Sequence, residues 1–250
     1  MKRLGVALLL VAASAAAQDR RKSGTEFMSE STRAMQRDDT QNPAMLWVAN
    51  GGALWQAKAG KAGKSCAACH GDVAGMRGVA SRYPAFDPSA GRVVTLGERI
   101  NLCRTGKQQA AAFAPESEGL LGLEAHVALQ SRGLPLAPPA DAATRAAAAR
   151  GQALYGQRIG QLNLSCAQCH DDSWGRKLAG ATIPQAHANA YPIYRLEWQG
   201  MGSLQRRLRN CMSGVRAQVP PLGAQELVDL EAWLALRAQG MALETPGVRP

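Results

Sequence analysis

Two short stretches of the chain decide its fold: Ser65-Cys66-Ala67-Ala68-Cys69-His70 and, 100 residues later, Ser165-Cys166-Ala167-Gln168-Cys169-His170. Each contains the pattern Cys-x-x-Cys-His, which is the attachment signal of c-type haem. Two sulfurs three positions apart bond the edge of the macrocycle, and the next residue places an imidazole on the iron. We therefore predict two covalently bound haem c groups, one at Cys66, Cys69 and His70 and the other at Cys166, Cys169 and His170.

The sequence around the two motifs is an internal duplication. At an offset of 100 residues Gly51 matches Gly151, and after the motif the offset becomes 108, so that Cys103 falls on Cys211. The second half therefore carries eight extra residues just after its motif. The matches keep their order through each unit, so we predict two tandem units of the same fold.

Each unit is predicted to consist of helices joined by loops. Leu227, Leu230 and Leu234 recur at three- and four-residue spacing, which predicts an amphipathic helix near the end of the second unit. Strand-like alternation of any length is missing from the sequence. We therefore predict a mostly α fold made of two tandem cytochrome c-type haem domains. The other helices are expected at residues 51–58 and 147–155, and at residues 96–103 and 203–212.

Composition suggests where one segment ends and the next begins. Residues 18–43 are polar and lack periodicity, so we expect an extended or partly disordered arm, and the proline-rich stretch 134–139 is typical of a linker. The predicted segments are a signal peptide at 1–17, an N-terminal extension at 18–43, a first cytochrome c domain at 44–133, a linker at 134–143, and a second cytochrome c domain with the active site at 144–250.

The first residues have the pattern of a secretory signal peptide. Met1-Lys2-Arg3 is followed by an apolar run, and Ala15-Ala16-Ala17 forms a small-residue cleavage site. The apolar run is shorter than the roughly 20 residues that span a bilayer. We therefore predict a protein secreted to the periplasm, without a membrane anchor.

The formal net charge of +10 bears on the choice of partners. A nucleic-acid partner is discounted, because the charge is spread thinly and a signal peptide sends the chain away from nucleic acid. A basic surface that attracts anionic substrates or acidic partner proteins fits better.

The second axial ligand distinguishes classes of haem protein, since ordinary electron-transfer cytochromes c use methionine or histidine opposite the first histidine. Cysteine is the soft ligand in register in both units, as Cys103 and Cys211. We therefore predict His70 and Cys103 on the first iron and His170 and Cys211 on the second. A disulfide between Cys103 and Cys211, or two buried free thiols, are the alternatives. The methionines without a counterpart in the other unit are Met76, Met201 and Met212.

Basic residues surround the second of these cysteines. Arg207 stands one helical turn before Cys211, so both side chains can lie on one face, and Arg216 follows five residues after it. Guanidinium groups bind tetrahedral oxyanions and favour a thiolate at a nearby cysteine. The first unit has Arg99 in register with Arg207 but fewer basic neighbours. We therefore predict that the second haem is the reactive one.

Two histidines lie outside the motifs. His126 aligns with Trp233 on the apolar face of the last helix, so we expect a core or rim residue. His187 lies in the insertion of the second unit, where a surface loop is expected, although it could border the second haem.

The run Ser203-Leu204-Gln205-Arg206-Arg207-Leu208-Arg209-Asn210-Cys211-Met212-Ser213-Gly214-Val215-Arg216, together with the two motifs, resembles the dihaem SoxA subunit of the SoxAX cytochromes. The resemblance begins at about Trp47. It implies a heterodimer with a small monohaem cytochrome, SoxX, and L-cysteine S-thiosulfotransfer, in which thiosulfate is joined oxidatively to a cysteine of the carrier SoxYZ. It also implies that Cys211 carries a persulfide, that Arg207 contacts the substrate, and that two electrons leave through haem to a cytochrome c acceptor.

Two other functions compete with this one. A thiosulfate dehydrogenase that forms tetrathionate is expected to have a ligand other than cysteine on its second haem, and the register of Cys103 argues against that. A plain dihaem electron carrier has little use for paired thiolate ligands, because these depress the reduction potential.

Overall fold

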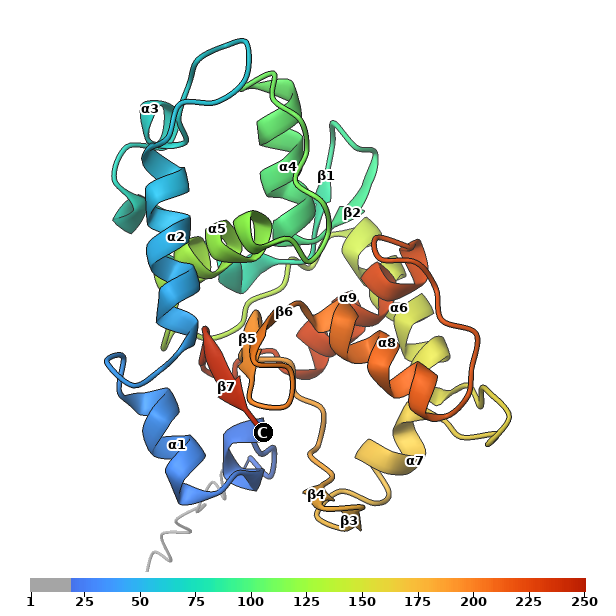
Figure 1. Cartoon of the computed structure of the whole chain (residues 1–250). Helices are drawn as coiled ribbons and strands as arrows, with labels where there is room; N and C mark the ends of the chain where they lie inside the picture. Colours follow the sequence, from blue (N-terminus) through green and yellow to red (C-terminus); the bar gives the residue numbers. More distant parts are fainter. Residues whose placement is uncertain (1–18) are drawn as a thin grey trace, which may run out of the picture.

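The computed structural model describes residues 19–250, so the predicted signal peptide at 1–17 lies outside the described residues. Helices are the main regular structure of each unit, as predicted, and the chain passes once through each unit (Figure 1). The helical elements are η1 (Gly24–Phe27), α1 (Glu30–Arg37), α2 (Ala44–Gln56), α3 (Ala67–His70), η2 (Val73–Met76), η3 (Ala80–Arg82), α4 (Leu96–Gly106), α5 (Glu118–Leu129), α6 (Ala142–Gly156), α7 (Cys166–His170), α8 (Leu204–Gly214) and α9 (Gln225–Arg237).

The strands are two or three residues long, which is why the sequence shows no alternation. They form an antiparallel pair in the first unit, a second pair in the insertion, and a three-stranded sheet in the order β6-β5-β7. In that sheet β5 is antiparallel to β6 and parallel to β7. The strands are β1 (Ala85–Asp87), β2 (Arg92–Val94), β3 (Lys177–Leu178), β4 (Ala181–Thr182), β5 (Ile193–Arg195), β6 (Gly200–Gly202) and β7 (Gly247–Arg249).

Each unit is built on one crossing of its first helix with its last, α2 with α5 and α6 with α9. Glycine makes the crossing possible. A Cβ atom on Gly51 would lie 2.0 Å from the carbonyl oxygen of Gly122, and one on Gly151 would lie 1.9 Å from that of Asp229. No side chain fits at either distance, so the matched glycines of the duplication mark the two places where helix backbones touch.

The N-terminal extension is folded, and the expectation of an extended or partly disordered arm is wrong. Ser23 caps η1 through a capping box, and the Ser29 hydroxyl accepts from the backbone N–H of Thr32 at the start of α1. The Gln36 side chain accepts from the backbone N–H of Val248 at 2.9 Å. This last contact joins residues more than 200 positions apart, so hydrophobic periodicity along the extension could not reveal it.

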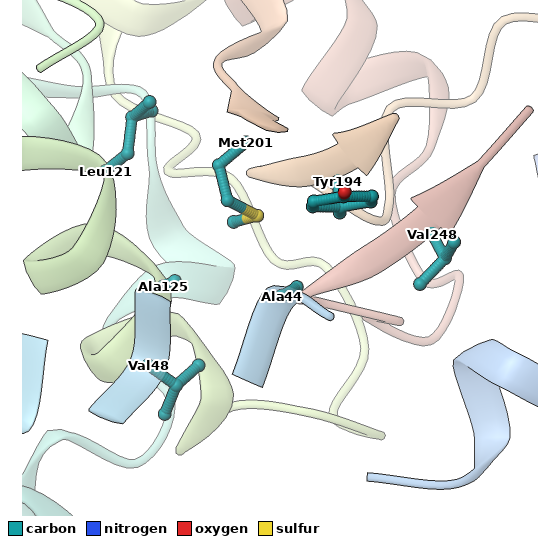
Figure 2. Packing of buried hydrophobic residues seen from close by; sticks show 7 residues of the cluster. All are labelled: Ala44, Val48, Leu121, Ala125, Tyr194, Met201 and Val248. Atoms are coloured by element: carbon teal, nitrogen blue, oxygen red, sulfur yellow. The ribbon is translucent and has the colours of Figure 1, made fainter. Parts of the chain in front are cut away.

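The segment expected to be a linker is packed against the end of the second unit. Leu136 is buried, its N–H donates to the carbonyl of Met241 at 2.9 Å, and its own carbonyl accepts from Gly240 at 2.8 Å. A further apolar cluster joins the units directly (Figure 2). It packs α2 and α5 of the first unit against the sheet of the second, and contains Ala44, Val48, Leu121, Ala125, Tyr194, Met201 and Val248. The two units therefore hold each other in place.

Between the units lies a cavity of about 150 Å³, lined by matching positions of the duplication. Glu124 and Glu231 both line it, and Glu98 and Glu116 approach from the first unit. Burial raises the pKa of Glu124 to about 7 and that of Glu231 to about 8. At neutral pH the Glu231 carboxyl is therefore mostly protonated, and the Glu124 carboxyl is protonated in about half of the molecules. Within residues 19–250, no helix is both long enough and apolar enough to span a bilayer.

These two carboxyls predict a loss of stability as the pH rises. In the unfolded chain both carboxyls ionise near pH 4.5, whereas in the folded protein Glu124 ionises near pH 7 and Glu231 near pH 8. The free energy of unfolding should therefore fall from about pH 4.5 to about pH 8, by on the order of 1 kcal/mol per pH unit for each group, and then level off. The double variant Glu124→Gln with Glu231→Gln should flatten this slope and be more stable than the original at about pH 9, as measured by denaturant unfolding.

The exposed Glu226, in the first turn of α9, provides the control. Glu226→Gln should leave the slope unchanged. If the double variant kept the slope of the unaltered protein, the two buried carboxyls would not be its source.

Candidate functional site

The two motifs begin short helices with a capping serine. The Ser65 hydroxyl accepts from the backbone N–H of Ala68 at 3.0 Å, and the Ser165 hydroxyl accepts from that of Gln168 at 3.2 Å. Capping fixes the start of the turn that carries both cysteines and the histidine. The serine before each motif is therefore part of the motif in structural terms.

Apolar side chains from three directions surround each motif. In the first unit Cys66 packs in a cluster built on Trp55, and in the second Cys166 packs in one built on Tyr155. Met76 lies in the first cluster and Met212 in the second, whereas Met201 lies in the cluster between the units. The other members of the second cluster are Leu154, Ala167, Ala186, Ala188, Leu204, Leu208, Leu230, Trp233 and Leu234.

Each candidate distal cysteine lies close to the motif of its own unit. Burial raises the pKa of the Cys166 thiol to about 11, and the nearby Cys211 sulfur adds to the shift. Burial also raises the pKa of the Cys66 thiol, with a contribution from Cys103. All six cysteines are free, so the alternative disulfide between Cys103 and Cys211 is not formed. The structure thus pairs Cys103 with the first motif and Cys211 with the second.

The imidazole of His170 has one hydrogen bond that fixes its tautomer. Its Nδ1 lies 2.7 Å from the carbonyl oxygen of Pro184. A carbonyl can only accept, so Nδ1 carries the proton and the lone pair on Nε2 is left for a metal. Burial lowers the pKa of His170, which also favours the neutral ring that a metal requires.

Arg237 ties together the two loops on either side of this hydrogen bond. Its guanidinium forms an ion pair with Asp171, next to His170, and donates to the carbonyl of Gln185, next to Pro184, at 3.2 Å. The Tyr155 hydroxyl donates to Asp171 at 3.0 Å. The residue matching Arg237 in the first unit is Gln130, whose side chain donates to the carbonyl of His126 in its own helix. This network was not predicted from the sequence, although the mismatch between residues 130 and 237 of the duplication is a signal of it.

Arg207 is a half-buried cation one turn before Cys211 on α8. Within the described residues 19–250 its side chain has no ion pair and no hydrogen bond, although it lies close enough to act on the pKa of His170. The matching Arg99 is neutralised by Asp87, with Nη1 and Oδ2 3.2 Å apart. Arg216 is exposed, and its backbone carbonyl accepts from the N–H of Gln161 at 3.2 Å. The two units therefore differ in charge at this position, because Arg99 has an acidic partner and Arg207 has none among residues 19–250.

The two remaining histidines differ in their surroundings. His126 packs against Trp55, with ring centroids 6.2 Å apart, as expected of a core or rim residue. His187 lines a cavity with His170, Asp171 and Arg237, and burial lowers its pKa to about 4. His187 lies in a loop, as expected, but it is half-buried, and residues 20 and 21 of the N-terminal extension line the same cavity.

The donors present fit a haem. Each unit offers two thiols at the start of a helical turn, an imidazole at the end of that turn, a further cysteine sulfur nearby, and apolar walls. In the part of the chain that the structure describes, no three His, Cys, Asp or Glu side chains converge as they do around a bare ion. Two protein ligands suit an iron whose other ligands come from a macrocycle.

The chain resembles known proteins along nearly all of its length. A family model described as SoxA/TsdA, cytochrome c domain, matches twice, over residues 50–136 and 150–243. The L-cysteine S-thiosulfotransferase subunit SoxA of Pseudaminobacter salicylatoxidans is 37% identical over 91% of this chain and 80% of that relative, and the one of Paracoccus pantotrophus is 33% identical over 91% and 78%. The crystal structure of SoxXA from P. pantotrophus superposes with a TM-score of 0.88 at 32% identity, covering 92% of this chain and 87% of that one.

The fold defines a c-type cytochrome built from two tandem cytochrome c domains. The chain belongs to the SoxA family of these cytochromes. The predicted family, the fold class and the binding of haem c are thereby confirmed.

The Arg237 network predicts an effect confined to the second haem. Arg237→Gln, which installs the residue of the first unit, should free the loops that carry Asp171 and Pro184 and so loosen the orientation of His170. Electron paramagnetic resonance of the oxidised protein should show one low-spin signal shifted or broadened and the other unchanged.

Arg150→Gln is the matched control, because it removes the Arg150–Asp229 ion pair of the same unit, at 2.7 Å, away from the His170 loops. It should lower stability and leave both signals in place. Identical spectra for Arg237→Gln and the unaltered protein would remove Arg237 from the haem environment.

Proposed function

We propose that this chain is the subunit that binds thiosulfate in an L-cysteine S-thiosulfotransferase, and that the second unit holds the active site. One observation carries the proposal: beside Cys211 lies a half-buried arginine without an acidic partner among residues 19–250, whereas the matching arginine of the first unit is neutralised. Curated relatives with this activity in their names cover nine-tenths of the chain, which supports the same reaction here.

The proposal assigns two covalently bound haem c groups. Cys66 and Cys69 attach the first, with His70 and Cys103 on its iron. The second unit supplies the same set, namely Cys166, Cys169, His170 and Cys211. When bound, the haems supply one-electron acceptors close to the sulfur chemistry. The pairing of each distal cysteine with its own motif supports these assignments.

The residues of the second unit suit the binding of a dianion. Joining thiosulfate to a carrier thiol forms one S–S bond and releases one proton and two electrons. Arg207 offers paired, charge-assisted hydrogen bonds to a sulfonate group, and its positive charge offsets the cost of taking the dianion out of water. Cys211, carrying a persulfide, is the protein sulfur placed beside the bound substrate. The first unit, with its arginine neutralised, serves as a structural or relay site.

The proposal includes the partners and the compartment. A monohaem cytochrome of the SoxX type forms a heterodimer with the chain, and the close structural match to SoxXA supports this pairing. A SoxYZ-type carrier presents the accepting cysteine, and a cytochrome c takes the electrons. Export to the periplasm follows from the leader pattern at residues 1–17.

Cys211 has the clearest predicted effect on activity. Cys211→Met should keep both haems, because thioether sulfur still binds iron, but it should lower thiosulfate transfer at least about a hundredfold, because the reactive sulfur is gone. The measurement is turnover with thiosulfate, the carrier and a cytochrome c acceptor, with haem quantified in the same samples.

Cys103→Met in the first unit is the matched control, and it should retain much of the activity. Full activity in Cys211→Met would remove Cys211 from the active site. Tetrathionate formed without the carrier would favour a thiosulfate dehydrogenase, and no turnover under any pairing would favour an electron carrier.

Arg207 is predicted to act on substrate binding rather than on the haem. Arg207→Ala should raise the KM for thiosulfate about ten- to a hundredfold, the equivalent of one or two charge-assisted hydrogen bonds, and leave the haem spectrum intact. The steady-state dependence of rate on thiosulfate concentration measures this. An unchanged KM would contradict the role.

A further inference from the structure

At one position of the duplicated hairpin, the side-chain charge is negative in the first unit and positive in the second. β1 and β5 are the first strands of matching antiparallel hairpins, which place Asp87 opposite Arg92 and Arg195 opposite Gly200. The offset of 108 that aligns Arg99 with Arg207 also aligns Asp87 with Arg195. An acid of the first unit is therefore an arginine in the second.

The neighbours of this position are the same in both units. In the first unit Asp87, Arg99 and Cys103 all lie close enough to Tyr83 to act on its pKa, which burial raises. In the second unit the residues at the matching positions act on Tyr191, whose pKa burial raises to about 12. The residues of this second set are Arg195, Arg207 and Cys211. Each unit therefore contains the same cluster, which consists of a strand residue, a helix arginine, the candidate distal cysteine and a tyrosine.

The electrostatic result is opposite in the two copies. In the first unit the Asp87 carboxylate pairs with Arg99 at 3.2 Å. In the second unit Arg195 stands where Asp87 stands in the first, and its pKa is lowered by burial and then by the charge of Arg207. Two guanidinium groups close together in a half-buried place repel each other unless an anion lies between them.

The Arg195 side chain is held in place, and only 13% of it is exposed. Its Nε donates to the carbonyl of Pro250 at 2.8 Å, and its guanidinium stacks over the Trp198 ring at 5.1 Å. Nη2 pairs with Glu197 at 2.7 Å, and that carboxylate is 58% exposed and so largely screened by water. No partner of Nη1 is present among residues 19–250, which leaves it free to donate.

The other charged groups around the cluster do not neutralise it. Arg206 also stacks over the Trp198 ring, at 4.2 Å, and adds a further positive charge. Arg249 acts on the pKa of Tyr191 but is paired with Glu244 at 3.1 Å. With Arg195 and Arg207 at the positions that Asp87 and Arg99 occupy in the first unit, the cluster is more positive than its first-unit copy.

We propose that Arg195 is a second anion-binding residue of the active site, which together with Arg207 binds the two negative charges of thiosulfate beside Cys211. This inference rests on the function proposed above and extends it, because one arginine would accept any anion whereas two select a dianion. In the first unit the negative Asp87 pairs with Arg99. In the second unit the positive Arg195 takes the place of Asp87, so that Arg207 and Arg195 are both available to bind an anion.

The test compares variants of the haem-loaded heterodimer by steady-state kinetics and by calorimetric titration with thiosulfate. Arg195→Gln should raise both KM and Kd about tenfold with a smaller change in kcat, as expected for the loss of one charge-assisted hydrogen bond. Arg195→Asp should raise them further, because an acid there would pair with Arg207 as Asp87 pairs with Arg99. Arg176→Gln, which removes an exposed arginine of the same unit, should change neither by more than about twofold.

Two further variants separate charge from packing. Arg195→Lys keeps the charge and should keep KM within about threefold of the original, whereas Glu197→Gln removes the screening acid and should lower KM about twofold. Unchanged KM and Kd in Arg195→Gln, or a loss in Arg195→Lys as large as in Arg195→Gln at full haem content, would overturn the inference. If the unaltered heterodimer neither bound nor turned over thiosulfate, the proposed function itself would fail, which is a separate result.

Discussion

Close contact between two helix backbones organises each half of the molecule. At Gly51 and Gly151 the first helix of a unit lies so near the last that any side chain would collide with a carbonyl. The same crossing places Trp55 and Tyr155 behind the motif loops. The Trp55 indole donates to the carbonyl of Gly71 at 3.1 Å, and the Tyr155 hydroxyl donates to Asp171 at 3.0 Å. The motif turns are positioned by this contact, and so is everything that they carry.

On this common frame the two units have diverged in charge rather than in shape. The first unit neutralises its helix arginine with Asp87, and the second places Arg195 at the same register position. The hairpin keeps its register with either charge at this position, whereas a change at the glycine crossing would disrupt the fold. The same frame thus holds a closed ion pair in one copy and two arginines at the matching positions in the other.

The N-terminal extension, the segment at 134–137 and the carboxyls between the units all contribute to the contact between the two units. The N-terminal extension lies against β7 and against the loop that carries His187, and the segment at 134–137 hydrogen-bonds to residues 240–243. Between the units, Glu124 and Glu231 are buried with no arginine or lysine among the groups that shift their pKa values. The interface therefore combines apolar packing with two carboxyls whose pKa values burial raises to near neutrality.

Local chemistry was readable from the sequence. The Cys-x-x-Cys-His motif can be recognised because its residues are neighbours in the sequence. The duplication identified Cys103, Cys211 and Arg207, because the two units keep the same spacing between matching residues. The missed features all join residues far apart, as Arg237 and Asp171 are separated by 66 positions and Gln36 and Val248 by 212. Hydrophobic periodicity reports on residues within a few turns of each other, so it could not show that α1 docks on β7 or that His187 lines a cavity with His170. The sequence by itself determined the two Cys-x-x-Cys-His motifs and the register of the cysteine and the arginine that follow each of them. The tertiary structure alone decided that Arg99 has an acidic partner and that Arg207 has none among residues 19–250, because that depends on what the fold brings opposite each side chain.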